Sequence, residues 1–112
     1  MSVEHIKMQR VLQEFRTIQK DINAQTILAF VYIANRDEQG MTTTVLEVGQ
    51  FLGCSSASAS RNVSILAGLT YRHTKGHGLV YAEENPERRI EKFIRLTDEG
   101  RQLSAMIKEY LS

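Results

Sequence analysis

The chain has 112 residues, with 14 Lys and Arg against 13 Asp and Glu, a formal net charge of +1 and one cysteine. This length is that of one small domain, which excludes a large multi-lobed enzyme. One cysteine cannot form an internal disulfide bond, and no run of roughly 18 apolar residues is present to span a membrane. The counts therefore favour a cytoplasmic globular protein over a secreted scaffold or a membrane protein.

The charges are distributed unevenly along the chain. No carboxylate occurs between Val48 and Ala82, whereas Arg61, Arg72 and Lys75 fall within this stretch. The stretch is either a neutral segment that is buried or faces a partner, or a surface that meets phosphates, where a carboxylate would repel the ligand. The residue types in the stretch favour the second interpretation.

The first 22 residues predict an amphipathic helix, with apolar side chains at helical spacings and charged ones on the opposite face. Asn23 is a suitable N-cap for a second helix from Ala24 to about Asn35, which is apolar on most sides and therefore central to the core. A polar loop is predicted over residues 36–40. The apolar stripe of the first helix consists of Met8, Val11, Leu12, Phe15, Ile18 and Ile22.

Two short helices are predicted within residues 44–67. Thr42, Thr43 and Thr44 offer caps for the first helix, over residues 45–52, and Gly53 ends it. A serine opens the second helix, which continues to about residue 67. The second helix lies inside the stretch without carboxylates, and the first overlaps this stretch from residue 48 onward.

The last third of the chain changes period. Residues 79–81 and 90–96 predict two strands of a hairpin, with a turn at 85–87 between them, so that residues 78–97 form a wing. Thr97 caps a final helix over residues 97–112, and the acidic residues in its first turn suit the helix dipole. The predicted order is therefore four helices, a hairpin and a last helix.

The pair of short helices has the layout of a helix-turn-helix. Steeply crossing helices need a small residue where they touch and a glycine at the turn, which Gly49 and Gly53 supply. Ala59, Val63 and Leu66 form the buried stripe of the second helix. The opposite face carries small hydroxyl residues and one arginine, which suit close approach to a major groove and contacts with phosphates or base edges. This outer face consists of Ala57, Ser58, Arg61 and Ser64, with Ser60 at its edge and Ser55 and Ser56 at the helix N-terminus, where free amides bind a phosphate.

Three stretches together resemble the MarR-type winged helix-turn-helix regulators: LGCSSASASRNVSIL, GLVYAEENPERR and IRLTDEGRQL. They contain an LG turn, a serine-rich helix with an SR pair, a GLV strand, an arginine-rich tip with a proline, and an LTxxGR helix start. The resemblance covers about residues 26–111 and implies a wing arginine, Arg88 or Arg89, that enters the minor groove. It also implies a homodimer built from the N- and C-terminal helices.

The chain departs from the family pattern at three points. Residues 68–77 are longer than the usual join and hold Arg72, His73, Lys75 and His77, so this segment is either an added DNA-contacting loop or a longer helix end. The tip reads NPERR where DPxDRR is common, which leaves open which of the two arginines takes the key position. The chain also stops one helix short of the usual family length, so the expected dimer depends on fewer contacts or is weaker.

Other candidate sites are weaker. Cys54 is interpreted as a small core thiol in the turn, and His5, His73 and His77 have no metal-ligand spacing with it, so neither a metal nor a cofactor is expected. The carboxylates near residues 83–87 are interpreted as a solvated strand end. An effector site is possible in the family, but no residue here indicates a ligand.

We therefore expect a mostly α, winged helix-turn-helix protein in one domain, residues 1–112, that acts as a sequence-specific double-stranded DNA-binding transcriptional regulator, a repressor-like homodimer and not an enzyme. The alternative is a winged-helix module for protein interaction or replication in a phage or plasmid system. The expected DNA-binding residues are Thr44, Ser55, Ser56, Ser58, Ser60, Arg61, Ser64, Arg72, Lys75, Arg88 and Arg89. The expected dimerisation residues are Met8, Leu12, Phe15, Tyr110 and Leu111.

Overall fold

The computed structural model describes residues 2–71, 78–88 and 90–112 of the chain. The elements follow the predicted order, so the predicted fold class, mostly α with a β-hairpin wing, is confirmed. The predictions for Arg72, His73, Lys75, His77 and Arg89 lie outside the described residues. The elements are α1 (Val3–Ile18), α2 (Ala24–Glu38), α3 (Val45–Leu52), α4 (Ser56–Gly68), β1 (Val80–Glu84), β2 (Lys92–Leu96) and α5 (Asp98–Leu111).

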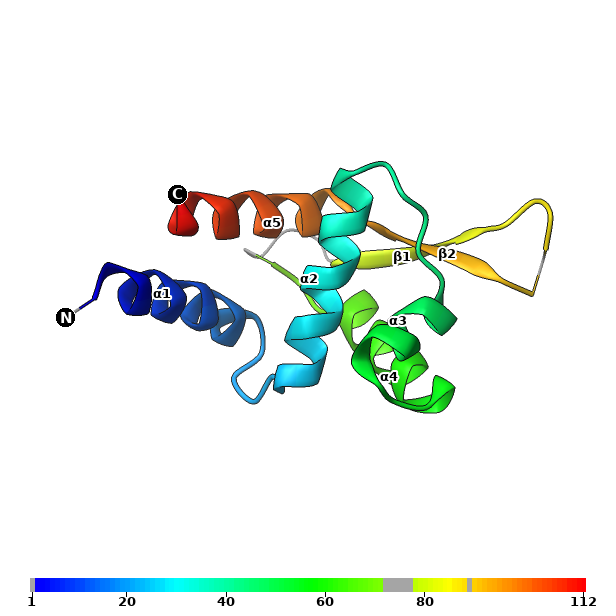
Figure 1. Cartoon of the computed structure of the whole chain (residues 1–112), viewed down its shortest axis with the longest axis horizontal. Coiled ribbons are helices and arrows are strands. Elements are labelled where there is room, and N and C mark those ends of the chain that lie inside the picture. Colours follow the sequence, from blue (N-terminus) through cyan, green and yellow to red (C-terminus); the bar gives the residue numbers. More distant parts are fainter. Residues whose placement is uncertain (1, 72–77, 89) are drawn as a thin grey trace.

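Helix α2 lies at the centre of the molecule (Figure 1). Helices α1 and α5 pack side by side at the end that holds both termini, and α3 and α4 pack on the other side of α2. The hairpin projects at the end of the molecule opposite to the termini. None of the described helices is long and apolar enough to cross a membrane. The central helix therefore lies between the terminal helices and the helix pair, whereas α5 also contacts β2 of the hairpin.

Side-chain caps set where the helices begin. Asn23, Thr44, Ser55 and Thr97 each accept a hydrogen bond from the backbone amide three residues later, as the sequence predicts. Thr44 also forms a capping box with Glu47, whose carboxylate accepts the Thr44 amide at 3.0 Å. A cap of this kind stabilises a helix by about 1 kcal/mol, so the starts of these helices are fixed by local contacts.

Two helix ends differ from the prediction. Helix α1 ends at Ile18 rather than at residue 22, because the chain turns between residues 19 and 23 to reach the start of α2. Helix α2 continues to Glu38, through part of the stretch predicted as a polar loop. The longer α2 depends on contacts with residues beyond its end, which the polarity of residues 36–38 does not indicate.

Arg36 accounts for the longer α2. Its guanidinium donates hydrogen bonds to the Thr43 hydroxyl at 2.9 Å, the Thr42 carbonyl at 2.6 Å and the Glu47 carboxylate at 2.9 Å. The same guanidinium lies 5.6 Å from the centre of the Tyr32 ring, within the range of a cation–π contact. The last turn of α2 is therefore a junction with the segment before α3, and the prediction of a loop there is wrong.

The core forms where α2 meets its neighbours. Phe15 of α1 and Phe30 of α2 are both fully buried and meet edge to face, with ring centroids 5.7 Å apart. Ile33 of α2, Leu66 of α4 and Leu103 of α5 are also fully buried. Helix α2 is thus the central helix that the sequence predicts.

The two strands of the hairpin pair antiparallel, from Val80 opposite Leu96 to Glu84 opposite Lys92. The predicted strand over 90–96 is therefore too long at its start, because pairing stops at Lys92. Ile90, which the sequence places in that strand, lies in the tip with its side chain fully exposed. The apolar character of Ile90 misled the prediction, since this residue has no partner strand to pack against.

Contacts with the helices fix the base of the hairpin. The Arg95 guanidinium of β2 lies 3.0 Å from the Glu83 carboxylate on β1 and 3.9 Å from the Asp37 carboxylate on α2. The Ile94 amide donates to the Thr43 carbonyl at 2.7 Å. The segment before α3 is therefore hydrogen-bonded to β2, which sets the position of the hairpin relative to α3.

Candidate nucleic-acid interface

Helices α3 and α4 approach each other closely at Gly49. A Cβ atom at this position would lie 3.4 Å from the Ala59 Cβ and 3.4 Å from the Cys54 carbonyl oxygen. Gly53 follows α3 with φ at +69°, a left-handed conformation that glycine adopts without strain. The small contact residue and the turn glycine are the ones that the sequence predicts, and the two helices form a helix-turn-helix.

The faces of α4 divide nearly as predicted. Ala59 and Leu66 are fully buried and Val63 is partly buried, which confirms the predicted stripe. Ser58 departs from the predicted outer face: it is half-buried, and its hydroxyl lies 3.4 Å from the side-chain oxygen of Gln25 on α2. The residues of the predicted outer face that are exposed are Ala57, Ser60, Arg61 and Ser64.

A buried asparagine that the sequence reading overlooked ties α4 to α2. Asn62 is 4% exposed, and its amide nitrogen donates to the Gln25 side-chain oxygen at 2.8 Å and to the Ser58 carbonyl at 3.1 Å. Its side-chain oxygen accepts a 2.7 Å hydrogen bond from the Thr26 hydroxyl. Asn62 lies three residues after Ala59, on the buried stripe, and a polar residue on that stripe was the available signal.

Three hydroxyl residues predicted to contact DNA lie at helix starts. Ser55 and Ser56 are exposed, and the Ser55 hydroxyl accepts the Ser58 amide at 3.1 Å. Thr44 is 8% exposed, and its hydroxyl is held by the amide and the carboxylate of Glu47, both at 3.2 Å. Thr44 thus acts as a cap, whereas the two serines stand at the open end of α4.

The described part of the stretch without carboxylates carries little charge. Among its described residues, 48–71 and 78–82, Arg61 is the one cation. The hairpin is mixed in charge, with Arg88 and Lys92 beside the carboxylates Glu87 and Glu91 in its described part. The exposed face of α4 is therefore polar with a single positive charge, and the other two cations of the stretch, Arg72 and Lys75, lie outside the described residues.

The hairpin tip places a cation beside an apolar residue. Arg88 is exposed, as the expected DNA contact at this position requires. The turn before it is held by Asn85, which is 8% exposed and whose side-chain oxygen accepts the Glu87 amide at 2.9 Å. The tip thus has a defined turn, from which Arg88 and the fully exposed Ile90 both project into solvent.

No family model matches the chain, and no curated protein matches its sequence. Solved structures do match it. The complex of MepR from S. aureus with DNA is 17% identical, with a TM-score of 0.70 over 96% of this chain and 74% of that one. The heme sensor PefR from Streptococcus agalactiae, in complex with heme, is 13% identical, with a TM-score of 0.66 over 96% of this chain and 65% of that one. A mutant MarR from E. coli is 16% identical, with a TM-score of 0.65 over 97% of this chain and 70% of that one.

The fold is that of the MarR-family regulators. The MarR-type fold confirms the resemblance carried by the three sequence stretches, since the helix pair, the strand and the LTDEGR helix start occur in the predicted order. The matched chains are longer, because this chain spans 65 to 74% of their lengths. At 13 to 17% identity, the matches establish the fold and leave the function to be argued from the site.

The terminal helices of the chain carry the residues predicted to form a dimer. Phe15 is fully buried in the core of the single chain, whereas Met8, Leu12 and Leu111 are 52%, 43% and 48% exposed. Tyr110 is half-buried. Four of the five predicted dimerisation residues therefore keep exposed surface, whereas Phe15 is a core residue of the single chain and has no surface to offer a partner.

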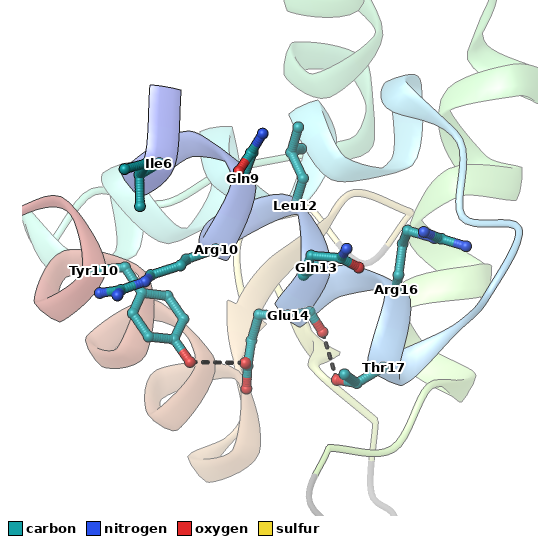
Figure 2. Close-up of a pocket in the computed structure, with 9 residues that line it drawn as sticks. All are labelled: Ile6, Gln9, Arg10, Leu12, Gln13, Glu14, Arg16, Thr17 and Tyr110. Carbon is teal, nitrogen blue, oxygen red and sulfur yellow. Dashed lines mark hydrogen bonds between the residues drawn. The ribbon is translucent and has the colours of Figure 1, made fainter. Parts of the chain in front are cut away.

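A concave surface of about 750 Å³ lies along α1 and ends at Tyr110 of α5 (Figure 2). The Tyr110 hydroxyl donates to the Glu14 carboxylate at 3.0 Å, and Tyr71 donates to the other oxygen of this carboxylate at 2.6 Å. Glu14 of α1 is thus hydrogen-bonded both to α5 and to the segment that follows α4. The surface exposes Leu12 beside polar and charged side chains of α1.

Cys54 and the histidines add no second site. Cys54 is half-buried in the turn between α3 and α4, next to the Gly49 contact. Within the described residues, no group of three His, Cys, Asp or Glu side chains is placed to hold a metal ion. His73 and His77 lie outside the described residues.

Proposed function

We propose that this MarR-type chain binds double-stranded DNA at specific sequences and regulates transcription as a repressor-like homodimer. One observation carries the proposal: the exposed, carboxylate-free face of α4 stands beside a projecting hairpin. Small side chains at Ala57, Ser60 and Ser64 allow the axis of α4 to come close to the floor of a major groove. Arg61, in the same face, has the length and the donors to bond a guanine edge or a phosphate.

The contacts between α4 and α2 support a role of α4 in recognising the DNA sequence. Specific recognition requires that the exposed side chains hold a fixed rotation relative to the DNA. Asn62 supplies such a restraint, because its hydrogen bonds with Thr26 and Gln25 couple α4 to the central helix. The matched structure of MepR is a DNA complex, which adds support from a protein of the same fold.

The homodimer is proposed from the exposed apolar residues of the two terminal helices. Met8 and Leu12 on α1 and Leu111 on α5 lie on elements that pack together, so one partner surface can cover all three. A twofold dimer would place its two α4 helices in successive major grooves, about 34–36 Å apart, on a palindromic site. Bound at a promoter, such a dimer blocks polymerase by steric exclusion.

A mobility-shift titration tests the proposal. The protein is first used to select the duplex that it binds most tightly from a random pool. This selected duplex and a scrambled duplex are then titrated with the protein at two salt concentrations. We expect tighter binding to the selected duplex and affinity that falls with salt on both duplexes. The absence of binding at low salt, or equal affinity for both duplexes, refutes sequence-specific regulation and favours the alternative of a winged-helix protein-interaction module.

Light scattering tests the dimer separately. We expect the mass of two chains for the wild type and a shift toward one chain for Leu12→Asp. Ser104→Asp, a half-buried position on α5 away from these residues, serves as the matched control for loss of folding. A single-chain mass for the wild type at micromolar concentration would remove the homodimer from the proposal.

A further inference from the structure

Ile90 is an apolar residue whose side chain is unusually exposed to solvent. Its side chain is 100% exposed, whereas the next most exposed large apolar side chain of the described residues, Val3, is 58% exposed. Single exposed apolar residues are common on protein surfaces, so exposure alone assigns Ile90 no role. Its position in the fold does.

Ile90 and the first residue of α4 line the same groove. A groove of about 730 Å³ lies between the hairpin tip and the helix-turn-helix. It is lined by the start of α3, the first residue of α4 and residues of the tip. Ser56 lines it from α4, Leu46 from α3, and Arg88 and Ile90 from the tip. Figure 1 shows the hairpin projecting beyond α3 on this side of the molecule. A duplex that receives α4 therefore runs past the tip.

The charges at the tip leave room for an apolar contact. Over residues 87–92 the sequence has three cations, Arg88, Arg89 and Lys92, and two carboxylates, Glu87 and Glu91, which oppose part of the attraction of the cations to the DNA backbone. A tip of this mixed charge is poorly suited to act through phosphates alone. An apolar side chain that leaves water on binding adds affinity that does not depend on salt.

We infer, on the basis of the proposed function, that Ile90 inserts as an apolar wedge into the minor groove beside the major groove that α4 reads. Apolar side chains inserted from the minor groove partly unstack a base step and kink the duplex. Unstacking is easiest at pyrimidine–purine steps such as TA, so the wedge selects a flexible step at a fixed distance from the bases that α4 contacts. Arg88 holds the backbone next to that step.

The wedge is tested with selected duplexes that carry 2-aminopurine at successive positions, since the fluorescence of this base rises when it unstacks. We expect the full chain to raise the fluorescence at one step on each side of the site. Ile90→Ser should abolish the rise and weaken binding about tenfold, with the salt dependence of affinity unchanged. Ile90→Met should retain the rise, because methionine also serves as an apolar wedge.

Two controls separate the wedge from other effects. Arg88→Gln should flatten the salt dependence and keep the fluorescence rise, whereas Val31→Ser, at an exposed apolar position of α2, should change neither. No fluorescence rise with the wild type, or an unchanged rise with Ile90→Ser, overturns the inference while DNA binding itself stands. A wild-type chain that binds no duplex refutes the proposed function and the wedge together.

Discussion

The Thr26 hydroxyl donates a 2.7 Å hydrogen bond to the side-chain oxygen of Asn62, inside the contact between α2 and α4. Asn62 in turn donates to Gln25, so the exposed helix of the helix-turn-helix is held to the central helix by polar as well as apolar contacts. Apolar contacts alone allow a helix to rotate at low cost, whereas these bonds are satisfied at one rotation of α4. This contact therefore selects which side chains of α4 face outward.

Asn62→Ala should lower the free energy of unfolding by about 1–3 kcal/mol, because the half-buried side-chain oxygen of Gln25 loses the Asn62 donor at 2.8 Å. Thr26 loses less, since its hydroxyl also lies 3.0 Å from the Asn23 side-chain oxygen. Urea titration measures the change. Ser64→Ala, on the exposed face of the same helix, is the control and should stay within about 0.5 kcal/mol. Superimposable unfolding curves for Asn62→Ala and the wild type would contradict the role assigned to this contact.

Arg61→Ala should reduce discrimination between the selected duplex and a scrambled one. Loss of a base contact by arginine costs about 1–3 kcal/mol on the correct site and little on others. Competition titrations with both duplexes measure this difference, with Lys20→Ala, an exposed cation in the turn before α2, as the control. An equal loss of affinity on both duplexes would show that Arg61 contacts the backbone and reads no base.

Glu14→Ala should destabilise the junction of α1 and α5. The Glu14 carboxylate accepts hydrogen bonds from Tyr71, which is 1% exposed, and from Tyr110 (Figure 2). Its removal should cost about 1–3 kcal/mol in the free energy of unfolding, and Tyr110→Phe, which removes one bond, about 0.5–1.5 kcal/mol. Glu4→Ala, on the exposed first turn of α1, serves as the control. If Glu14→Ala unfolds like Glu4→Ala, the junction does not depend on this carboxylate.

Gly100→Ala should disrupt the packing of α5 on the hairpin. A Cβ atom at this position would lie 2.1 Å from the carbonyl oxygen of Leu79, which also accepts the Thr97 amide at 3.0 Å. Because the obstacle is backbone, the start of α5 or β1 must move, and we expect a loss of about 1–3 kcal/mol or more. Thermal unfolding measures it as a lower Tm. Gly68→Ala, where a Cβ atom would meet nothing within 4 Å, should leave Tm nearly unchanged.

The sequence predicted most of the fold from contacts between residues close in the chain. The caps at Asn23, Thr44 and Thr97 each bond an amide three residues later, and Gly53 ends α3 by its own backbone conformation. These features depend on a few neighbouring residues, so a single sequence displays them. The three- and four-residue spacing of apolar residues also predicted correctly that Ala59 and Leu66 lie in the core, because this spacing places residues on one face of a helix.

Residues whose role depends on distant parts of the chain were predicted less well. Arg36 was assigned to a loop because its neighbours are polar, but its partners Thr43 and Glu47 lie on the next element. Asn62 was overlooked because its partners are 36 and 37 residues away. Ile90 was assigned to a strand because it is apolar, and only the pairing of β1 with β2 leaves it in the tip.

The stretch without carboxylates contains α4, the exposed helix of the helix-turn-helix, and this coincidence can be read from the sequence alone. The sequence also determined the element order, the caps and the glycine turn, all of which rest on local conformation and spacing. Tertiary packing alone decided that Phe15 belongs to the core and that Ile90 is fully exposed at the edge of the groove. Exposure and partnership are properties of the folded surface, because they depend on which distant segments cover each side chain.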